Sequence, residues 1–156
     1  MRRGVLSLLI AAALVAVACG PSSARRDQDR AEIERLLADY ASRLSEAYRS
    51  GSAETLREVA TEREVSRVHR QISEQAGNGR LLVAELVSST VQSIEFNRTS
   101  ASATVSETWN LKVLAVGSGA VLSESPGQEN RILYSLTRDG GRWWILSRIL
   151  ARSSED

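Results

Sequence analysis

Glu107 is the side chain in this sequence that is best placed to do chemistry. Between Ala101 and Val113 the odd-numbered positions are apolar and the even-numbered positions are polar, except that Glu107 is an ionisable residue on the apolar face. Burial disfavours the charged form of a carboxylate, which suits such a group to proton transfer. Tyr40 and His69 could supply a second proton-transferring group. These three residues are the candidate catalytic side chains.

A structural role for Glu107 is the competing interpretation. A buried carboxylate must replace the hydrogen bonds that it loses with water, and Arg131 or Arg148 on later strands could supply them. Alternatively, Glu107 lies at the mouth of the fold, where water can reach it. His69 borders an apolar stripe beside Val68, a position typical of a structural histidine. The structural interpretation is favoured, so we expect no catalytic residue and no enzyme activity.

Tryptophans are the candidates for contacting a ligand or a partner protein. Trp143 and Trp144 are adjacent on one predicted strand, so their side chains point to opposite faces of the sheet and at most one of them joins Trp109 inside. Exposed tryptophan often anchors a protein interface. We therefore expect Trp109 and Trp144 to be the positions that contact a ligand or a partner.

Composition and motifs exclude several classes of function. The 156 residues include one His and one Cys, so a disulfide within the chain and the usual ligand sets for zinc and iron–sulfur clusters are excluded. A phosphate-binding loop, a nucleophile elbow and a metalloprotease motif are also missing. Basic and acidic side chains are nearly balanced, at 20 and 19, which argues against nucleic-acid binding. We expect no metal and no cofactor.

Residues 1–18 have the pattern of an export signal. Arg2 and Arg3 give a positively charged start, and residues 4–18 form a small, apolar run whose only polar member is Ser7. As a helix this run would be about 22 Å long, shorter than the roughly 30 Å hydrocarbon core of a bilayer. A removable signal peptide is therefore favoured over a transmembrane helix.

The end of this run, Ala16-Val17-Ala18-Cys19, resembles the lipobox of bacterial lipoproteins. The resemblance implies that the Cys19 sulfur receives diacylglycerol, that residues 1–18 are removed, and that Cys19 becomes an N-terminus acylated with fatty acids such as palmitate. Ala16 departs from the leucine that is more common at its position. The same residues also fit an ordinary signal peptidase site, and that interpretation would leave a free exported thiol.

A lipidated Cys19 would hold the protein permanently at a membrane, since each buried methylene of its acyl chains contributes about 0.8 kcal/mol. The expected location is the outer face of the cytoplasmic membrane or an outer membrane. The expected organisation of the chain is a signal peptide at 1–18, the lipidated cysteine and a short tether at 19–28, a folded domain at 29–152 and a tail at 153–156.

Hydrophobic spacing predicts three helices in the first half of the domain. From Asp29 to Ser50, apolar residues recur at intervals of three and four, as on one face of a helix. A short second helix follows. A third begins near Glu62, where Thr61 and Glu64 have the pattern of a capping box, in which the two side chains satisfy free backbone amides.

The second half of the domain alternates with a period of two and predicts an antiparallel sheet of about four strands. A glycine-rich stretch, 116–129, is expected to include a loop. Asp139-Gly140-Gly141 predicts a tight hairpin turn between the last two strands, because glycine supplies positive φ angles. The expected strands are 81–96, 101–113, 131–138 and 142–150.

This α+β order of elements resembles the nuclear transport factor 2-like superfamily. The resemblance implies a cone, in which a strongly curved sheet holds the first helix in its concave face. Members of the superfamily with enzymatic activity place an acid or base inside that cone. The most specific match is the ending Asp139-Gly140-Gly141-Arg142-Trp143-Trp144-Ile145-Leu146.

Within that superfamily, Val105-Ser106-Glu107-Thr108-Trp109, followed by the strand of Tyr134, is similar to the intermembrane-space domain of the chloroplast division proteins and their bacterial relatives. The similarity implies a domain that contacts another protein. The expected function is a lipid-anchored, non-catalytic binding or scaffold domain of the bacterial cell envelope, which contacts another envelope protein. The alternative is a small-ligand-binding domain, or an isomerase or dehydratase, that uses the cone interior around Glu107.

Mass spectrometry of the mature protein should find an acylated Cys19 as its first residue. Cys19→Ala should release the protein from the membrane, because it removes the only atom that can carry the acyl anchor. An unmodified N-terminus would contradict the lipoprotein interpretation.

Overall fold

A computed structural model describes residues 21–151, so the signal peptide, Cys19 and the predicted tail at 153–156 lie outside the described residues. Within this range, no helix is long and apolar enough to cross a bilayer. The elements occur in the order α1 (Pro21–Ser50), η1 (Glu54–Glu58), α2 (Glu62–Gly77), β1 (Arg80–Phe96), β2 (Ser100–Ala115), β3 (Val121–Asp139) and β4 (Arg142–Leu150).

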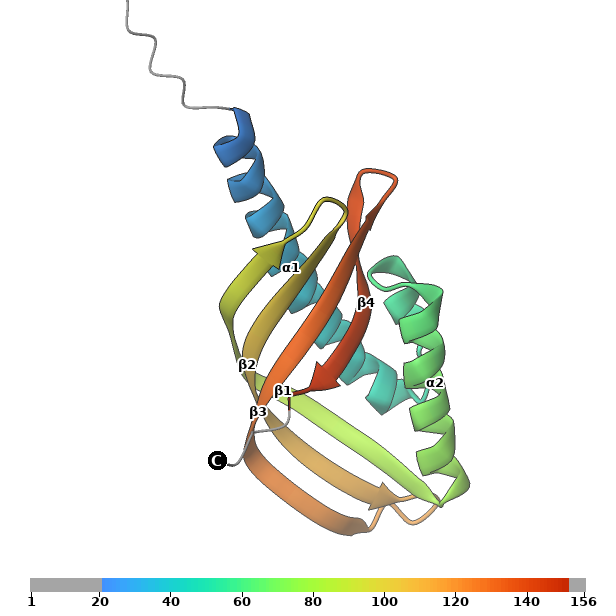
Figure 1. Ribbon diagram of the computed structural model, residues 1–156. Coiled ribbons are helices and arrows are strands. Elements are labelled where there is room, and N and C mark those ends of the chain that lie inside the picture. Colours follow the sequence, from blue (N-terminus) through green and yellow to red (C-terminus); the bar gives the residue numbers. More distant parts are fainter. Residues whose placement is uncertain (1–20, 152–156) are drawn as a thin grey trace, which may run out of the picture.

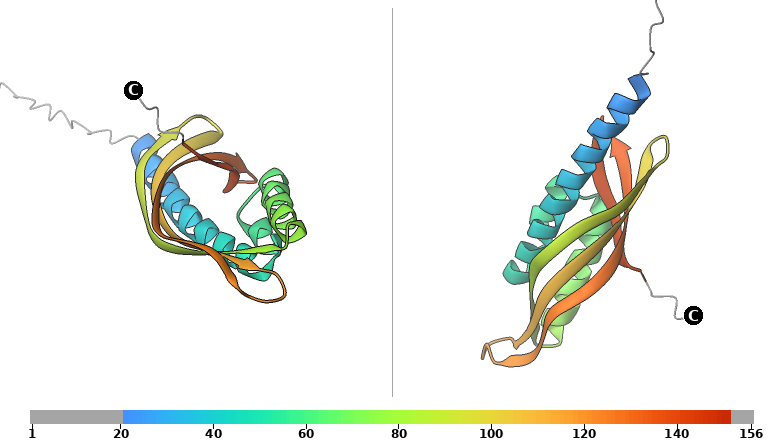
Figure 2. Two further views of the ribbon diagram at one scale, coloured as in Figure 1. Left: turned by 90° about the horizontal axis from the view of Figure 1, so that it is seen from below. Right: turned by 90° about the vertical axis from the view of Figure 1, so that its left-hand side faces the viewer.

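The four strands form one antiparallel meander in the order β1-β2-β3-β4, which confirms the predicted α+β class and sheet. Helix α1 lies across one face of the sheet, and α2 lies at its side, across from the end of β4 (Figures 1 and 2). The alternation predicted for β2 is also confirmed. Its inward side chains are buried, namely Ala101, Ala103, Val105, Glu107 and Trp109.

The sheet is not as strongly curved as the expected cone. Its strands change direction at local irregularities, two of which lie in β1 between Leu86 and Ser88 and between Val91 and Ser93. Buried side chains of α1, including Ile33 and Leu44, fill the concave face along the helix. Since this packing occupies the space beneath the strands, the sheet wraps around α1 without closing tightly over it (Figure 2).

The expected short second helix is a five-residue 3-10 helix, η1, so the structure has two α-helices among the described residues rather than three. Leu56 of η1 is fully buried, and the backbone on its C-terminal side is captured by the sheet. The Ile145 amide donates to the Val59 carbonyl at 3.0 Å, and the Thr61 amide donates to the Ile145 carbonyl at 2.9 Å. These bonds to β4 leave too few residues for a longer helix, and such short connections favour 3-10 geometry.

The tether prediction also needs correction, because α1 begins at Pro21 rather than Asp29. Proline is well tolerated in the first turn of a helix, where backbone amides have no partner within the helix. Residues 23–28 are exposed, and the first turns project beyond the sheet (Figure 1). Residues 21–28 are therefore a helical extension of about 12 Å, at 1.5 Å per residue, and belong to α1 rather than to a separate tether.

Helix α2 begins at Glu62 as predicted, but the predicted capping box does not form. Thr61 makes no capping hydrogen bond through its side chain, and its hydroxyl is the one buried side-chain polar atom among the described residues that has no partner. Glu64 is 1% exposed, so its carboxylate points into the interior instead of back to the helix start. Burial on the inner face of α2 has overridden the local capping pattern.

The β3–β4 hairpin forms where it was expected, and β3 is longer than expected. Gly140 and Gly141 have φ angles of 59° and 82°, which glycine adopts easily. β3 begins at Val121 instead of residue 131, so most of the expected loop is strand. A register shift lets this strand pass Gly127, whose amide donates to the Asn110 side chain at 2.9 Å.

Candidate functional site

Glu107 lies inside the domain, where donors from three strands surround its carboxylate. Its exposed fraction is 2%. Oε1 accepts a hydrogen bond from the Tyr134 hydroxyl at 2.5 Å. Oε2 accepts from the Trp109 indole N–H at 2.8 Å and from Arg148 Nη2 at 2.6 Å. Both carboxylate oxygens are therefore occupied by protein donors.

Arg148 balances the charge of Glu107 and also fixes its neighbours. Its Nε donates to the Tyr134 hydroxyl at 3.2 Å, and its guanidinium carbon lies 5.8 Å from the ring centroid of Trp109. The prediction of an arginine partner for Glu107 is confirmed for Arg148, whereas Arg131 is exposed and makes no such contact. A buried ion pair with these added hydrogen bonds offsets much of its desolvation cost.

Glu64 on α2 is a second buried carboxylate, with a parallel set of partners. Its Oε1 accepts from the Tyr40 hydroxyl at 2.5 Å and from Arg67 Nη2 at 2.6 Å. Arg67 Nε donates to the other oxygen at 2.8 Å. This forked contact is the strong, two-bond form of an arginine–carboxylate pair.

The two carboxylate clusters meet through their tyrosines. The rings of Tyr40 and Tyr134 pack edge to face, with centroids 5.8 Å apart and planes at 87°. Tyr40 comes from α1, and Tyr134 comes from β3. The combined set joins both helices to three strands, and we call it the buried glutamate network: Tyr40, Glu64, Arg67, Glu107, Trp109, Tyr134 and Arg148.

Both network tyrosines are held in their neutral, donating form. Burial is the largest cause that raises the pKa of Tyr134 well above its usual value, and Glu107 raises it further while Arg148 opposes the shift. Burial also raises the pKa of Tyr40, and the charge of Glu64 adds to this effect. Each hydroxyl therefore stays protonated and donates a hydrogen bond to a carboxylate.

The three candidate catalytic residues do not come together. Tyr40 bonds to Glu64 rather than Glu107. His69 is exposed on α2, while Glu107 is buried with Tyr134 and Arg148. The structure therefore forms no acid–base pair from Glu107, Tyr40 and His69.

Sequence reasoning missed Glu64, Arg67 and Tyr134. Glu64 matched a capping box, which concealed its inward direction. It precedes Val65, which begins the apolar face of α2, so its position beside that face was a usable signal. Tyr134 was detectable by alternation, because Ile132 and Leu136 on either side of it are buried.

The tryptophans divide between the interior and the surface. Trp109 is 3% exposed and belongs to the network, and Trp143 is 2% exposed with its indole N–H donating to Asp29 at 3.3 Å. Trp144 points to the opposite face of the sheet, as predicted, and is partly exposed. The Arg142 guanidinium carbon lies 4.4 Å from its ring centroid, which is cation–π geometry.

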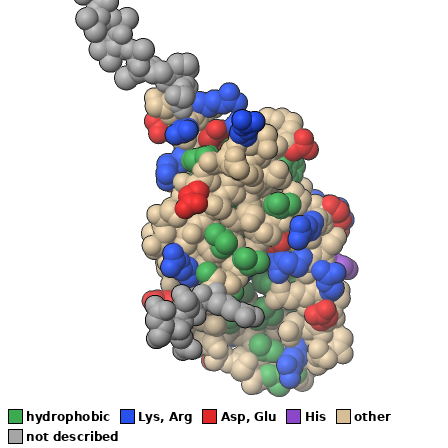
Figure 3. Space-filling model, viewed as in Figure 1, with side chains coloured by type: hydrophobic (Ala, Val, Ile, Leu, Met, Phe, Trp, Pro, Cys, Tyr) green, Lys and Arg blue, Asp and Glu red, His purple; other side chains and the backbone are tan. Residues whose placement is uncertain are grey.

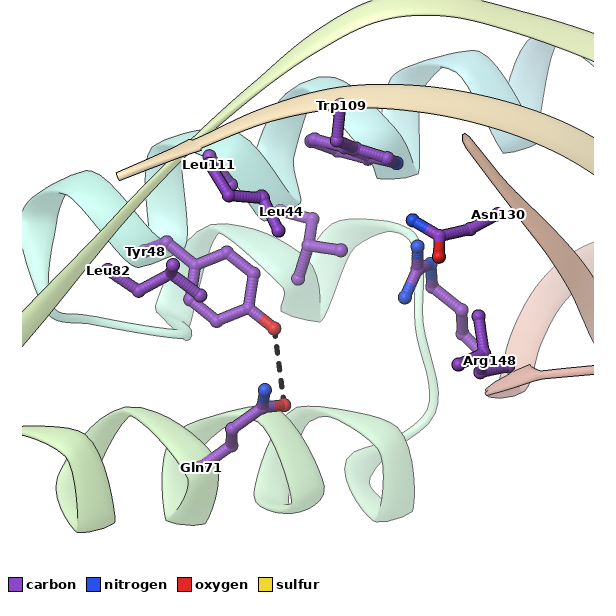
Figure 4. A pocket seen from close by; sticks show the side chains of 10 residues that line it. Leu44, Tyr48, Gln71, Leu82, Trp109, Leu111, Asn130 and Arg148 are labelled. Carbon is purple, nitrogen blue, oxygen red and sulfur yellow. Dashed lines mark hydrogen bonds between the residues drawn. The ribbon is translucent and has the colours of Figure 1, made fainter. Parts of the chain in front are cut away.

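One pocket of about 220 Å³ opens beside the network (Figure 4). Apolar side chains of α1, β1 and β2 form one part of its wall. Polar groups converge from the other elements: Gln71 from α2, Asn130 from β3 and Arg148 from β4. Tyr48 on α1 donates its hydroxyl hydrogen to Gln71 Oε1 at 3.2 Å at one side of this space.

The hydrogen bonds of the two buried carboxylates are all made within the domain. The network carboxylates already accept strong hydrogen bonds from arginine and tyrosine, and neither is directed toward an open space as a free base. In the part of the chain from 21 to 151, no group of three or more His, Cys, Asp or Glu side chains is placed to hold a metal ion. The pocket's polar groups can still orient a bound molecule.

Comparison with solved structures identifies the fold. The intermembrane-space region of the chloroplast protein ARC6 is similar, with a TM-score of 0.64 at 16% identity, over 78% of this chain and 95% of that one. An NTF2-like protein with a cystatin-like fold from Novosphingobium aromaticivorans has a TM-score of 0.51 at 18% identity, over 92% and 94% of the two chains. A Mycobacterium tuberculosis protein of unknown function has a TM-score of 0.52 at 16% identity, over 86% and 76%.

The domain therefore has the nuclear transport factor 2-like, or cystatin-like, fold, as the sequence predicted. At these identities the likeness establishes the fold alone. No protein-family model matches the sequence, and no curated protein matches it. The function must be argued from the residues of this chain.

The buried tyrosines predict a loss of stability in alkali. Their pKa values are higher in the folded state than in the unfolded chain, so their contribution is complete below about pH 10 and is lost as the pH rises above it. The unfolding free energy should fall by up to about 1.4 kcal/mol per pH unit for each tyrosine.

Urea unfolding between pH 8 and pH 11.5 measures this slope. The double variant Tyr40→Phe/Tyr134→Phe should show a flatter decline than the unmodified protein, since phenylalanine has no proton to release. Equal slopes would show that the two hydroxyls are not held protonated by the fold.

Proposed function

We propose that this chain is an exported, lipid-anchored binding domain of a bacterial cell envelope, which contacts another envelope protein and performs no catalysis. The proposal that the domain is non-catalytic rests on Glu107. Its two carboxylate oxygens accept hydrogen bonds from Tyr134, Trp109 and Arg148. An acid or base in an enzyme needs an oxygen directed at its substrate. Glu107 instead stabilises the interior.

The proposed location rests on the lipobox-like sequence before α1. The lipobox-like sequence ends at Cys19, and α1 begins two positions later, at Pro21. A lipid on Cys19 would therefore place the first turn of α1 at the membrane surface. The similar ARC6 structure is the intermembrane-space region of a chloroplast protein, and such a location is compatible with an envelope role for this fold.

The partner surface that we favour is the outward face of β3 and β4 around Trp144. Leu133 lies opposite Ile149 in the ladder, on the same side of the sheet as Trp144, and Ile149 is 50% exposed. Figure 3 looks onto β3 and β4, and hydrophobic side chains lie among uncharged atoms in the middle of this face. Tryptophan and arginine are enriched at the energetic centres of interfaces, so the stacked Trp144 and Arg142 suit this role.

This surface lies near the end of the domain that the anchor would hold. Asp29 of α1 bonds to Arg138 at 2.8 Å and to Trp143 at 3.3 Å, which places the β3–β4 hairpin beside the early turns of α1. Asp29 is about 12 Å along the helix from Pro21, at 1.5 Å per residue. Trp144 would therefore face a partner that lies close to the membrane.

Site-specific photo-cross-linking in living cells tests this proposal. A photoreactive amino acid at Ser147, on the outward face near Trp144, should yield one discrete cross-linked envelope protein. The same amino acid at His69, exposed on α2, should yield none. Trp144→Ser should lower the Ser147 cross-link at least tenfold, because loss of an interface anchor typically costs about 2 kcal/mol or more.

Leu122→Ser is the matched control, since Leu122 is a 55% exposed hydrophobic residue on the distant part of β3. It should leave the cross-link unchanged. Equal cross-linking from Ser147 and His69, or a Ser147 product that does not respond to Trp144→Ser, would contradict the proposed surface.

A further inference from the structure

The pocket beside the buried glutamate network is small and has a mostly apolar lining. Its apolar wall is formed by side chains from α1, β1, β2 and β4: Leu44, Leu82, Ala84, Trp109, Leu111 and Leu150. Its volume of about 220 Å³ equals the liquid volume of about seven water molecules, at roughly 30 Å³ each. This space suits a small molecule or fragment rather than an extended chain.

Two of the polar side chains at the pocket have a hydrogen-bond donor that no described residue uses, and a third, Asn130, offers both an amide oxygen and an amide nitrogen. Arg148 uses Nε on Tyr134 and Nη2 on Glu107, and no described residue accepts a hydrogen bond from its Nη1. Gln71 turns its oxygen toward Tyr48 and Arg67, which leaves its amide nitrogen as the unpaired end. Figure 4 shows the nitrogen atoms of Gln71 and Arg148 on opposite sides of the same space.

The charge at the pocket is already balanced. Arg148 is the cationic lining residue, and Glu107 lies 2.6 Å from it as its ion-pair partner. A bound anion would leave an excess negative charge in a partly desolvated space, and a bound cation would face the guanidinium directly. A neutral acceptor, such as a carbonyl oxygen, can use the free N–H groups without either cost.

We propose that this pocket binds a small neutral molecule that has an apolar body and a carbonyl or amide oxygen. The apolar body lies against Leu82 and Leu111, and the oxygen accepts a hydrogen bond from Gln71 Nε2. This inference rests on the pocket alone. It holds whether or not Cys19 is lipidated and whether or not Trp144 contacts a partner.

Hexanamide, hexanoate and hexylamine form a matched set of probes, since they share the apolar body and differ in the charge of the head group. The mature chain, in lipid nanodiscs if Cys19 is acylated and in buffer if it is not, is titrated with each probe, and the indole N–H signal of Trp109 is followed by NMR. Empty nanodiscs serve as the blank for partition into lipid. Hexanamide should shift this signal and bind at least about fivefold more tightly than either charged probe, the difference typical of one net hydrogen bond.

Two substitutions locate the binding site and its donor. Leu111→Phe should fill the pocket and abolish binding, while Leu114→Phe, on the other face of the same strand, should leave it intact. Gln71→Leu removes the amide donor at nearly constant size and should weaken hexanamide binding about fivefold. If circular dichroism shows that Leu111→Phe does not fold, Ala84→Leu fills the same pocket from β1.

Three results would overturn the inference. The first is no shift of the Trp109 signal with hexanamide up to its solubility limit. The second is binding of hexanoate or hexylamine that equals or exceeds that of hexanamide, which would refute the charge argument. The third is hexanamide binding that survives both pocket-filling variants, because the probe would then occupy another site.

Discussion

The structure depends on neutralising two carboxylates that it buries. Glu64 and Glu107 are 1% and 2% exposed, and burial of an unpaired charge would cost far more than the few kcal/mol by which a domain of this size is stable. Each carboxylate therefore receives an arginine and a tyrosine. These partners come from α1, α2, β3 and β4, so the two carboxylates are neutralised only when these elements pack correctly. The edge-to-face contact of Tyr40 with Tyr134 makes the two clusters continuous.

This constraint has consequences for function. A carboxylate whose hydrogen bonds join three strands is poorly suited to exchange protons with a substrate, which is why we propose a structural role for Glu107. The two places that we propose for recognition are the outward face around Trp144 and the small pocket beside Arg148. The helical start of α1 adds a geometric condition. If Cys19 carries lipid, helix α1 connects the domain to the membrane almost directly, and the β3–β4 hairpin lies on the membrane side of the domain.

Local patterns predicted most of the fold, and contacts distant in sequence accounted for what was missed. Alternation in β2 and the spacing of apolar residues in α1 are local signals, and both located the core correctly. The partners of Glu107 are set by packing between residues that are distant in sequence. Tyr134 is 27 positions from Glu107, and Arg148 is 41 positions from it. Glu64 shows how two local rules can conflict, because the same spacing that suggests a helix cap also places a side chain at the edge of the buried face. The fold resolved that conflict through Tyr40 and Arg67.

The central claim is that the Glu107–Arg148 pair is a structural bond, and a double-mutant cycle measured by urea unfolding tests it most directly. Glu107→Gln and Arg148→Met should each lower the unfolding free energy by about 3 to 5 kcal/mol, because each leaves a buried charge without its partner. The double variant should lose clearly less than the two single losses combined. A Glu107→Gln protein within about 0.5 kcal/mol of the unmodified chain would contradict the account, since it would show that the fold does not depend on this carboxylate.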